Sequence, residues 1–342
     1  MGSGRSHNPE EVLAMGAAVV FAPSPVLTVT IEDLDGEADI HIHAGGQGVW
    51  QARMLQALGA SVTLCGVFSG ETGRVARDLI QQHGIRVLGV EGAGSSGAYI
   101  HDRRGGERKE LAESRGHRLS RHELDQLYSL TMQAGIAAGT VILSGPAQEG
   151  LVPADAYRRL AADLTETGCT VIADLAGDRL TAAVNGGVAL VKVSHDELVD
   201  SGRAGSTGPE DLIRAMRDLV GEGAATVVVT RADLPSLLLH EDEVHEVHAP
   251  SLETVDTRGA GDSLTAGMAA ALASGSSVRE AVTQGSAAGA LNVTRHGLGT
   301  GDAETIRQLM GSVRIVPYRG GHQRESAKGT TPDELAKGLR TQ

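Results

Sequence analysis

The sequence predicts an α/β fold with a central, mostly parallel β-sheet flanked by helices and a small β lid. Two observations lead to this prediction. Short apolar runs of strand length alternate with longer amphipathic stretches of helical period, as in repeated strand–helix–strand units. A glycine-rich turn near residue 260 also opens directly onto a helix of small residues. The 342 residues, 41% of them hydrophobic, are enough for one large α/β domain or two ordinary ones.

The elements follow in order along the chain. We expect buried strands at five apolar runs, residues 62–67, 141–143, 170–173, 188–193 and 226–230. We expect helices between or after them, at residues 48–58, 153–165, 209–220 and 278–293. Pro153 and Pro209 open two of these helices, and proline suits the first helical turn.

Two stretches break this rhythm. Residues 17–43 and 95–112 are strand-like with alternating polarity, and they predict an antiparallel flap at the edge of the sheet, the lid. We expect the main domain to span residues 11–316. Residues 317–342 are polar and predict a flexible tail with a short helix at 332–339.

Composition excludes several classes of function. The formal net charge of −13 argues against nucleic acids and anionic membranes as general partners, because both require a positive face. No apolar stretch reaches the roughly 20 residues of a membrane span. The N-terminus has no signal-peptide apolar core, and Cys65 and Cys169 are expected to be buried free thiols. We therefore expect a cytoplasmic protein.

The turn Gly259-Ala260-Gly261, followed by Asp262, is the strongest candidate site. Its backbone N–H groups have almost no side-chain cover and precede a helix, so they are suited to binding an anion such as a phosphate. Coulomb repulsion would exclude a carboxylate from this place unless the reaction needs a base there. We interpret Asp262 as the group that accepts a proton during phosphoryl transfer. The alternative is that Asp262 only caps the helix.

Two other motifs are not read as sites. Gly92-Ala-Gly-Ser-Ser-Gly97 has the letters of a dinucleotide-binding turn, but a strand-like segment follows it where a helix is required. We expect a strand–turn–strand instead. His240, His245 and His248 do not converge along a strand as zinc ligands must, so we expect the solvated face of a hairpin.

A second glycine-rich turn, at Gly45 and Gly46, leads into the helix that carries Gln47 and Trp50. Glycine lets the backbone approach a ligand closely. Trp50 is the single tryptophan of the chain and lies in the first turn of this helix. It either stacks on a ligand or packs the helix against the flap, and the residues alone leave both interpretations open.

Together these segments resemble the ribokinase-like, or PfkB, carbohydrate kinases, and most of all their 1-phosphofructokinase and tagatose-6-phosphate kinase branch. The resemblance spans about residues 15–315. It rests on the following segments, in the family's order: 44–53, 106–113, 143–146, 173–177, 191–197 and 256–264.

The resemblance implies the ribokinase-like fold and transfer of the γ-phosphoryl of ATP to a sugar hydroxyl. It implies Asp262 as base, residues 259–261 as anion hole, Glu197 as a ligand of Mg²⁺, and lids that pair between the subunits of a homodimer. It further implies two groups of binding residues. The nucleotide would contact Lys192, Ser194, Thr230, Thr257, Gly259 and Gly261. The acceptor would contact Ser24, Thr28, Gly45, Gly46, Gln47, Trp50 and Asp262.

The acceptor side departs from the family pattern. The branch usually has an aspartate after its first strand, and here Thr28 takes that place. Gln47 and Trp50 replace the usual lysine and asparagine, and the loss of a cation weakens the case for a phosphorylated acceptor. The basic residues of the expected lid, Arg103, Arg104, Arg108 and Lys109, could compensate.

On the nucleotide side, Ser194 replaces the usual asparagine and residues 232–235 lack the usual glycines. Three functions follow from these observations. The first is an ATP- and Mg²⁺-dependent kinase of a sugar or sugar phosphate with an altered acceptor pocket. The second is a nucleoside kinase of the same fold. The third is a degenerate kinase that acts as a ligand-binding regulator, and the intact Asp262 argues against it.

Overall fold

The computed structural model describes residues 16–320 except 107, 149, 296 and 297. The start of the expected main domain, at residues 11–15, and the short helix expected at 332–339 lie outside the described residues. None of the helices in the described part of the chain is long and apolar enough to cross a bilayer.

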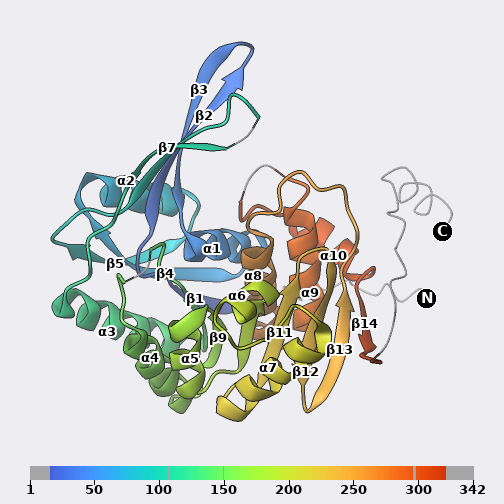
Figure 1. Cartoon of the computed structure of the whole chain (residues 1–342). Helices are drawn as coiled ribbons and strands as arrows, with labels where there is room; N and C mark the ends of the chain where they lie inside the picture. The colour runs from blue at the N-terminus through green and yellow to red at the C-terminus, as the bar shows by residue number, and fades with distance from the viewer. Residues whose placement is uncertain (1–15, 107, 149, 296–297, 321–342) are drawn as a thin grey trace, which may run out of the picture.

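The large sheet has ten strands in the order β14-β13-β12-β11-β10-β9-β8-β1-β4-β5 (Figure 1). The strands from β5 to β11 pair in parallel, and β12, β13 and β14 extend the sheet in antiparallel pairs. The parallel strands inside the sheet are buried on both faces, which explains why they appear in the sequence as continuous apolar runs, whereas β5 at the edge is partly exposed. Their bounds are β1 Ala17–Phe21, β4 Ser61–Ser69, β5 Arg86–Gly92, β8 Thr140–Ser144, β9 Thr170–Asp174, β10 Leu190–Ser194, β11 Thr226–Arg231, β12 Leu234–His240, β13 Glu243–His248 and β14 Arg314–Pro317.

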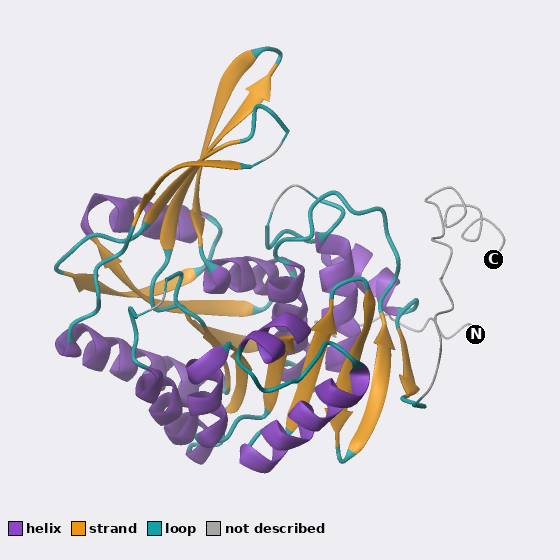
Figure 2. Cartoon of the chain, viewed as in Figure 1, coloured by secondary structure: helices purple, strands orange, loops and turns teal. Residues whose placement is uncertain are grey.

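Helices cover both faces of this sheet (Figure 2). One apolar core lies between the sheet and the layer of α3, α4, α5, α6 and α7, and a second core lies between the sheet and α1, α2, α8, α9 and α10. The predicted α/β architecture is therefore correct. The bounds are α1 Gln47–Ala57, α2 Gly70–Gln82, α3 Arg121–Ala138, α4 Ala154–Glu166, α5 Gly177–Asn185, α6 His195–Asp200, α7 Pro209–Glu222, α8 Ala260–Ala273, α9 Val278–Asn292 and α10 Ala303–Met310.

Helices α8 and α9 pack closely because small residues line their contact. A Cβ atom added to Gly267 would lie 2.7 Å from the Cα of Gly285. This close approach brings the C-terminal end of α9 beside the N-terminus of α8, where the predicted anion-binding turn lies.

The lid is a separate four-stranded sheet in the order β3-β2-β6-β7. Its hairpin of β2 and β3 projects from the body of the molecule (Figure 1). The strands are β2 Val26–Leu34, β3 Glu37–Gly45, β6 Ala98–Asp102 and β7 Lys109–Ser114.

The sequence prediction of the lid is wrong in three respects. Residues 17–21, assigned to the lid, form β1 of the large sheet, since their apolar side chains are buried on both faces. The lid is also not purely antiparallel, because β2 and β6 pair in parallel. Finally, it is a sheet of its own and does not extend the edge of the large sheet.

The two faces of the lid differ in polarity. Residues paired in register share a face, so Val29 lies with Ile42 and Ile100, and Thr28 lies with His43 and Tyr99. The apolar face is exposed, with 52% of Ile42 accessible, whereas Thr28 on the polar face is only 7% accessible. The polar face is thus the inner one.

The two motifs that were not read as sites have the expected structures. The motif at residues 92–97 forms the end of β5 and the turn to β6, so it joins two strands, as predicted. The segment with the three histidines forms the β12–β13 hairpin, also as predicted. Its face is less solvated than expected, because the side chain of His245 is only 13% accessible.

Candidate active site

The site is built around the N-terminus of α8. Gly259 adopts φ = 74°, a left-handed conformation that favours glycine, and it stands at the N-cap of the helix. Asp262 lies inside the first turn and not at the cap, so the capping alternative is wrong. Within the described part of the chain, the N–H groups of Gly259 and Gly261 have no hydrogen-bond acceptor. They remain available for an anion.

A buried asparagine at the end of α9 holds this turn in place. Asn292 donates through Nδ2 to the carbonyl oxygen of Arg258 at 2.7 Å and accepts from the hydroxyl of Ser263 at 3.1 Å. It therefore fixes residues on both sides of the turn. Sequence reasoning missed Asn292. The one signal was a polar residue at the end of a helix rich in alanine.

Lys192, on β10, brings a positive charge to the same turn. A Cβ atom on Gly261 would lie 2.8 Å from its Nζ atom, so only glycine permits this approach. Lys192 is buried and forms an ion pair with Asp174 Oδ1 at 3.1 Å. Burial acts to lower the pKa of Lys192, but the carboxylates of Asp174, Glu197 and Asp262 outweigh it and raise the pKa. Lys192 thus remains a cation beside the predicted anion site.

Asp262 has the electrostatics of a general base. Burial and the negative charge of Asp174 raise its pKa to about 7, with a further rise from Glu197, while Lys192 opposes them. A carboxyl group that titrates near neutral pH can accept a proton from a hydroxyl and release it afterwards. The structure therefore brings the predicted base, the predicted anion hole and Lys192 together.

The other nucleotide-side residues lie at the ends of adjacent strands. Ser194 ends β10 and pairs in register with Thr230 of β11. Glu197 accepts from the backbone N–H and the hydroxyl of Ser194 through Oε2, at 2.7 and 2.8 Å. Thr257 begins the turn, and its carbonyl oxygen accepts from the N–H of Ala260 at 3.5 Å.

On the acceptor side, two predicted residues bind the loop that follows β8. Ser24 Oγ accepts from the N–H of Ala147 at 3.0 Å, and Gln47 Oε1 accepts from the N–H of Gly145 at 2.8 Å. Gly46, with φ = 105°, is the N-cap of α1.

Two further acceptor-side residues, Thr28 and Trp50, pack against Gly45. A Cβ atom there would lie 2.9 Å from Thr28 Oγ1 and 3.1 Å from Cζ2 of Trp50. The Trp50 ring lies 5.7 Å from that of His43 on β3, and the guanidinium of Arg53 lies 5.5 Å from the indole centroid. These contacts support the packing interpretation of Trp50. Its stacking on a ligand stays a prediction.

The inner face of the lid carries a cluster of basic groups. Arg108 contacts His101 Nε2, and the two line a hollow with Tyr99 and Glu110. Burial, reinforced by the positive charges of Arg53 and Arg108, lowers the pKa of His43 to about 4. An acidic protein has thus gathered positive charge on one surface.

The four basic lid residues quoted from the sequence lie in different environments. Arg103 extends from the lid to Asp256 Oδ2 at 3.2 Å, just before the predicted anion-binding turn. Arg104 is exposed and pairs with Asp102 instead. Lys109 is exposed at the start of β7.

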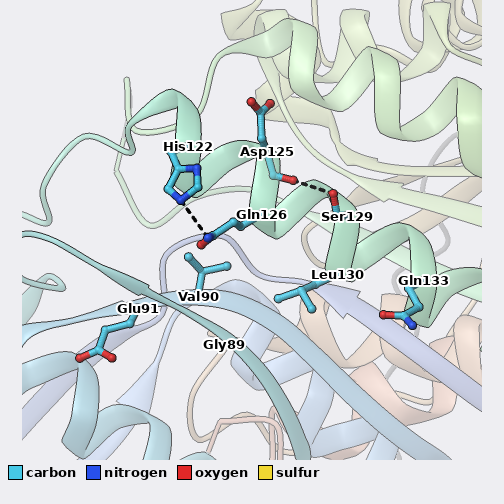
Figure 3. A pocket seen from close by; sticks show the side chains of 9 residues that line it. All are labelled: Gly89, Val90, Glu91, His122, Asp125, Gln126, Ser129, Leu130 and Gln133. Carbon is cyan, nitrogen blue, oxygen red and sulfur yellow. Dashed lines mark hydrogen bonds between the residues drawn. The ribbon is translucent and has the colours of Figure 1, made fainter.

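A second groove lies away from these residues, between β5 and α3 (Figure 3). Its lining includes Glu91, His122, Asp125 and Gln126, and the ring of His122 is hydrogen bonded to Gln126 at 2.9 Å. None of the predicted site residues lines it.

Proteins that resemble this chain in sequence are named phosphofructokinases, in agreement with the geometry of the candidate site described above. A 1-phosphofructokinase of Bacillus subtilis is 26% identical over 278 residues, covering 80% of this chain and 88% of the relative. An ATP-dependent 6-phosphofructokinase isozyme 2 of Escherichia coli is 29% identical over 258 residues, covering 74% and 82%.

Solved structures agree with the fold. Phosphofructokinase-2 of Escherichia coli in complex with potassium superposes with a TM-score of 0.78 at 25% identity, covering 87% of this chain and 99% of that structure. The predicted ribokinase-like fold is thereby confirmed. The family model described as pfkB family carbohydrate kinase matches residues 11–306. This chain therefore belongs to the pfkB family of carbohydrate kinases.

Proposed function

We propose that this kinase transfers the γ-phosphoryl group of ATP, bound with Mg²⁺, to a hydroxyl group of a phosphorylated sugar. The observation that carries the proposal is the convergence at the N-terminus of α8. There a carboxyl group whose pKa is about 7 stands beside two unpaired backbone N–H groups and a buried lysine.

In this mechanism Asp262 accepts the proton of the acceptor hydroxyl. The hydroxyl oxygen bonds to the γ-phosphorus while the bond from phosphorus to the β–γ bridging oxygen breaks, and ADP leaves with that electron pair. The N–H groups of Gly259 and Gly261 and the ammonium of Lys192 stabilise the negative charge on the transferring group.

The residues present fit a magnesium ion that is held mainly by phosphate oxygens and water. The described residues contain no cluster of three or more acidic, histidine or cysteine side chains that could hold a metal alone. Glu197 offers Oε1, since Oε2 is bound by Ser194. One carboxylate plus substrate phosphates is an ordinary environment for this ion. When bound, Mg²⁺ would neutralise charge on the phosphates.

The basic residues of the lid support an acceptor that is already phosphorylated. Gln47 offers no charge, but Arg103 and Arg108 place cations on the inner face of the lid, where Arg108 contacts His101. Arg108 is the best candidate for a phosphate contact, because Arg103 is already paired with Asp256 and Arg104 with Asp102. Guanidinium groups bind phosphate oxygens with charge-assisted hydrogen bonds.

The outer face of the lid supports a second element of the proposal, a homodimer formed through the lids. Ile40, Ile42 and Ile100 are 60%, 52% and 36% accessible in the single chain. Clustered exposed apolar side chains of this kind mark protein interfaces. A second copy would cover them while the polar inner faces remain directed at the acceptor.

Substitution of the base tests the central assignment. Asp262→Asn is expected to reduce kcat by about 10²–10⁴-fold, the range for loss of a positioned base. In the parent enzyme kcat/KM should rise with pH through about 7, as Asp262 loses its proton, and the variant should lack that rise.

Unfolding measurements supply an independent check on the base. The raised pKa means that ionisation of Asp262 disfavours the folded state, so its contribution to stability is lost as pH rises through about 7. Asp262→Asn should therefore increase the free energy of unfolding at pH 8. Turnover at the parent rate in the Asp262→Asn variant would contradict the assignment of Asp262 as the base.

Magnesium titration tests Glu197. Glu197→Gln should raise the Mg²⁺ concentration that gives half-maximal rate, because a hard cation and its bound waters favour a carboxylate over an amide. Asp196→Asn, at an exposed neighbouring carboxylate, is the matched control and should leave the titration unchanged. If both variants give the parent curve, Glu197 is only the partner of Ser194.

The acceptor is tested with a coupled ADP-release assay over free sugars, fructose 1-phosphate, fructose 6-phosphate and nucleosides. Arg108→Gln should raise KM for the preferred sugar phosphate about 10- to 100-fold, the cost of a lost charge-assisted hydrogen bond. Arg104→Gln removes an equal charge from an exposed arginine and should have little effect. Preference for an uncharged sugar, or equal KM values in both variants, would show that the acceptor carries no phosphate at the lid.

Sedimentation velocity tests the dimer. Ile42→Glu places a charge in the centre of the exposed lid face and should convert dimer to monomer. Val75→Glu adds the same charge at an exposed apolar residue of α2, outside the lid, and should not. A parent protein that sediments as a monomer at micromolar concentration would contradict the proposal.

A further inference from the structure

A single buried carboxylate connects the two sides of the site. Asp174 ends β9 and is 1% exposed. Its Oδ1 accepts from Lys192 at 3.1 Å, and its Oδ2 accepts from the hydroxyl of Thr265 at 2.7 Å and from Gln51 Nε2 at 2.9 Å. Three donors from three different elements therefore converge on one side chain.

Gln51 is the member of this group that belongs to the acceptor side. It lies on α1, four residues after Gln47, and is fully buried. Its Oε1 accepts from the hydroxyl of Ser144, at the end of β8, while its Nε2 donates to Asp174. A carboxylate oxygen can only accept here, so the orientation of the amide is defined by both contacts.

The other two donors belong to the phosphoryl-transfer side. Lys192 lies against Gly261 of the anion-binding turn. Thr265 follows Asp262 by three residues on α8, within one helical turn. Any movement of the Asp174 carboxylate would therefore displace the cation at the turn, the helix that carries the base, or both.

We propose that Gln51 is a positioning residue for phosphoryl transfer, which holds the Asp174 carboxylate in the orientation that keeps Lys192 against the Gly259–Gly261 turn. This inference rests on the proposed function of that turn as the site of the transferred phosphoryl group. It assigns to α1 a second task besides contacting the acceptor, since the same helix also fixes the cation on the opposite side of the reacting groups.

The rival explanation is that Gln51 only satisfies polar groups in the core. Both explanations predict a loss of stability when the amide is removed, so stability cannot separate them. They differ in what a charge at this place does to the bound nucleotide, because only a positioning residue acts on Lys192 through Asp174.

Gln51→Glu is the decisive variant because it is nearly isosteric and its effect depends on pH. The protonated carboxyl group can donate to Asp174 as the amide does. Once ionised, it lies beside Asp174 on β9, whose other oxygen binds Lys192 on β10, and the charges of Glu197 on α6 and Asp262 on α8 also act on that lysine. Two adjacent carboxylates repel, and the second one competes with the nucleotide for the lysine.

The readout is the affinity for Mg·AMP-PNP, measured by calorimetry from pH 5.5 to 8.5, together with kcat at saturating substrates. We expect Gln51→Glu to match the parent at low pH and to lose about tenfold in affinity and in relative kcat as pH rises. Gln56→Glu adds the same charge to a partly exposed position on the same helix and should follow the parent throughout. Gln51→Met should lower kcat by a factor that does not vary with pH.

A folded Gln51→Glu protein that follows the parent in affinity and relative kcat across this range would overturn the proposal. If that variant does not fold, Thr265→Val removes another donor from the same oxygen and should weaken Mg·AMP-PNP binding, whereas Thr265→Ser should not. Equal binding by both threonine variants would likewise overturn it. The affinity readout needs no acceptor, so a parent enzyme that phosphorylates no sugar phosphate would refute the proposed acceptor without deciding the role of Gln51.

Discussion

The buried ion pair between Lys192 and Asp174 is the interaction on which the rest of the site depends. Removing two charges from water is costly, and their mutual attraction offsets the cost only when the remaining hydrogen-bonding capacity is satisfied. Gln51 and Thr265 donate the hydrogen bonds that complete the surroundings of the Asp174 carboxylate. The unpaired N–H groups of the glycine turn lie beside the lysine, so the protein keeps a desolvated positive site ready for an anion. The same burial, acting with the charge of Asp174, raises the pKa of Asp262 into the neutral range.

The lid obeys a different constraint. In a single chain Thr28, Thr30 and His101 on its polar face are buried while Ile40 and Ile42 on its apolar face are exposed, the reverse of what a free-standing sheet would adopt. This polarity is consistent with a lid that binds a charged group on one side and a second apolar surface on the other. Arg103 connects it to Asp256, immediately before the predicted anion-binding turn, so the lid is in direct contact with this part of the candidate site.

The features that could be predicted from the sequence are those determined by residues close together along the chain. The strands at 62–67 and 226–230 were recognisable because both faces of a parallel strand are apolar. The turn at Gly259–Gly261 was recognisable because glycines before a helix leave its first N–H groups uncovered. Residues 17–21 were misassigned because a short apolar strand next to a longer alternating one gives no local sign of which sheet it joins. Asn292 and Gln51 were not assigned a role, because a polar residue in a helix shows its partner only after the chain has folded.

The sequence by itself determined the α/β class, many of the strands and helices of the main sheet, and the glycine turn before α8 with its candidate base. These follow from periodicity and from the conformations available to adjacent residues, which are local properties. Only the tertiary structure decided that Lys192, Asp174, Thr265 and Gln51 meet, that Arg108 shares the inner lid face with His101, and that the isoleucines lie on the outer face. Those contacts join residues as many as 123 positions apart, and they arise because parallel strands end at a common edge of the sheet, where side chains from separate segments converge.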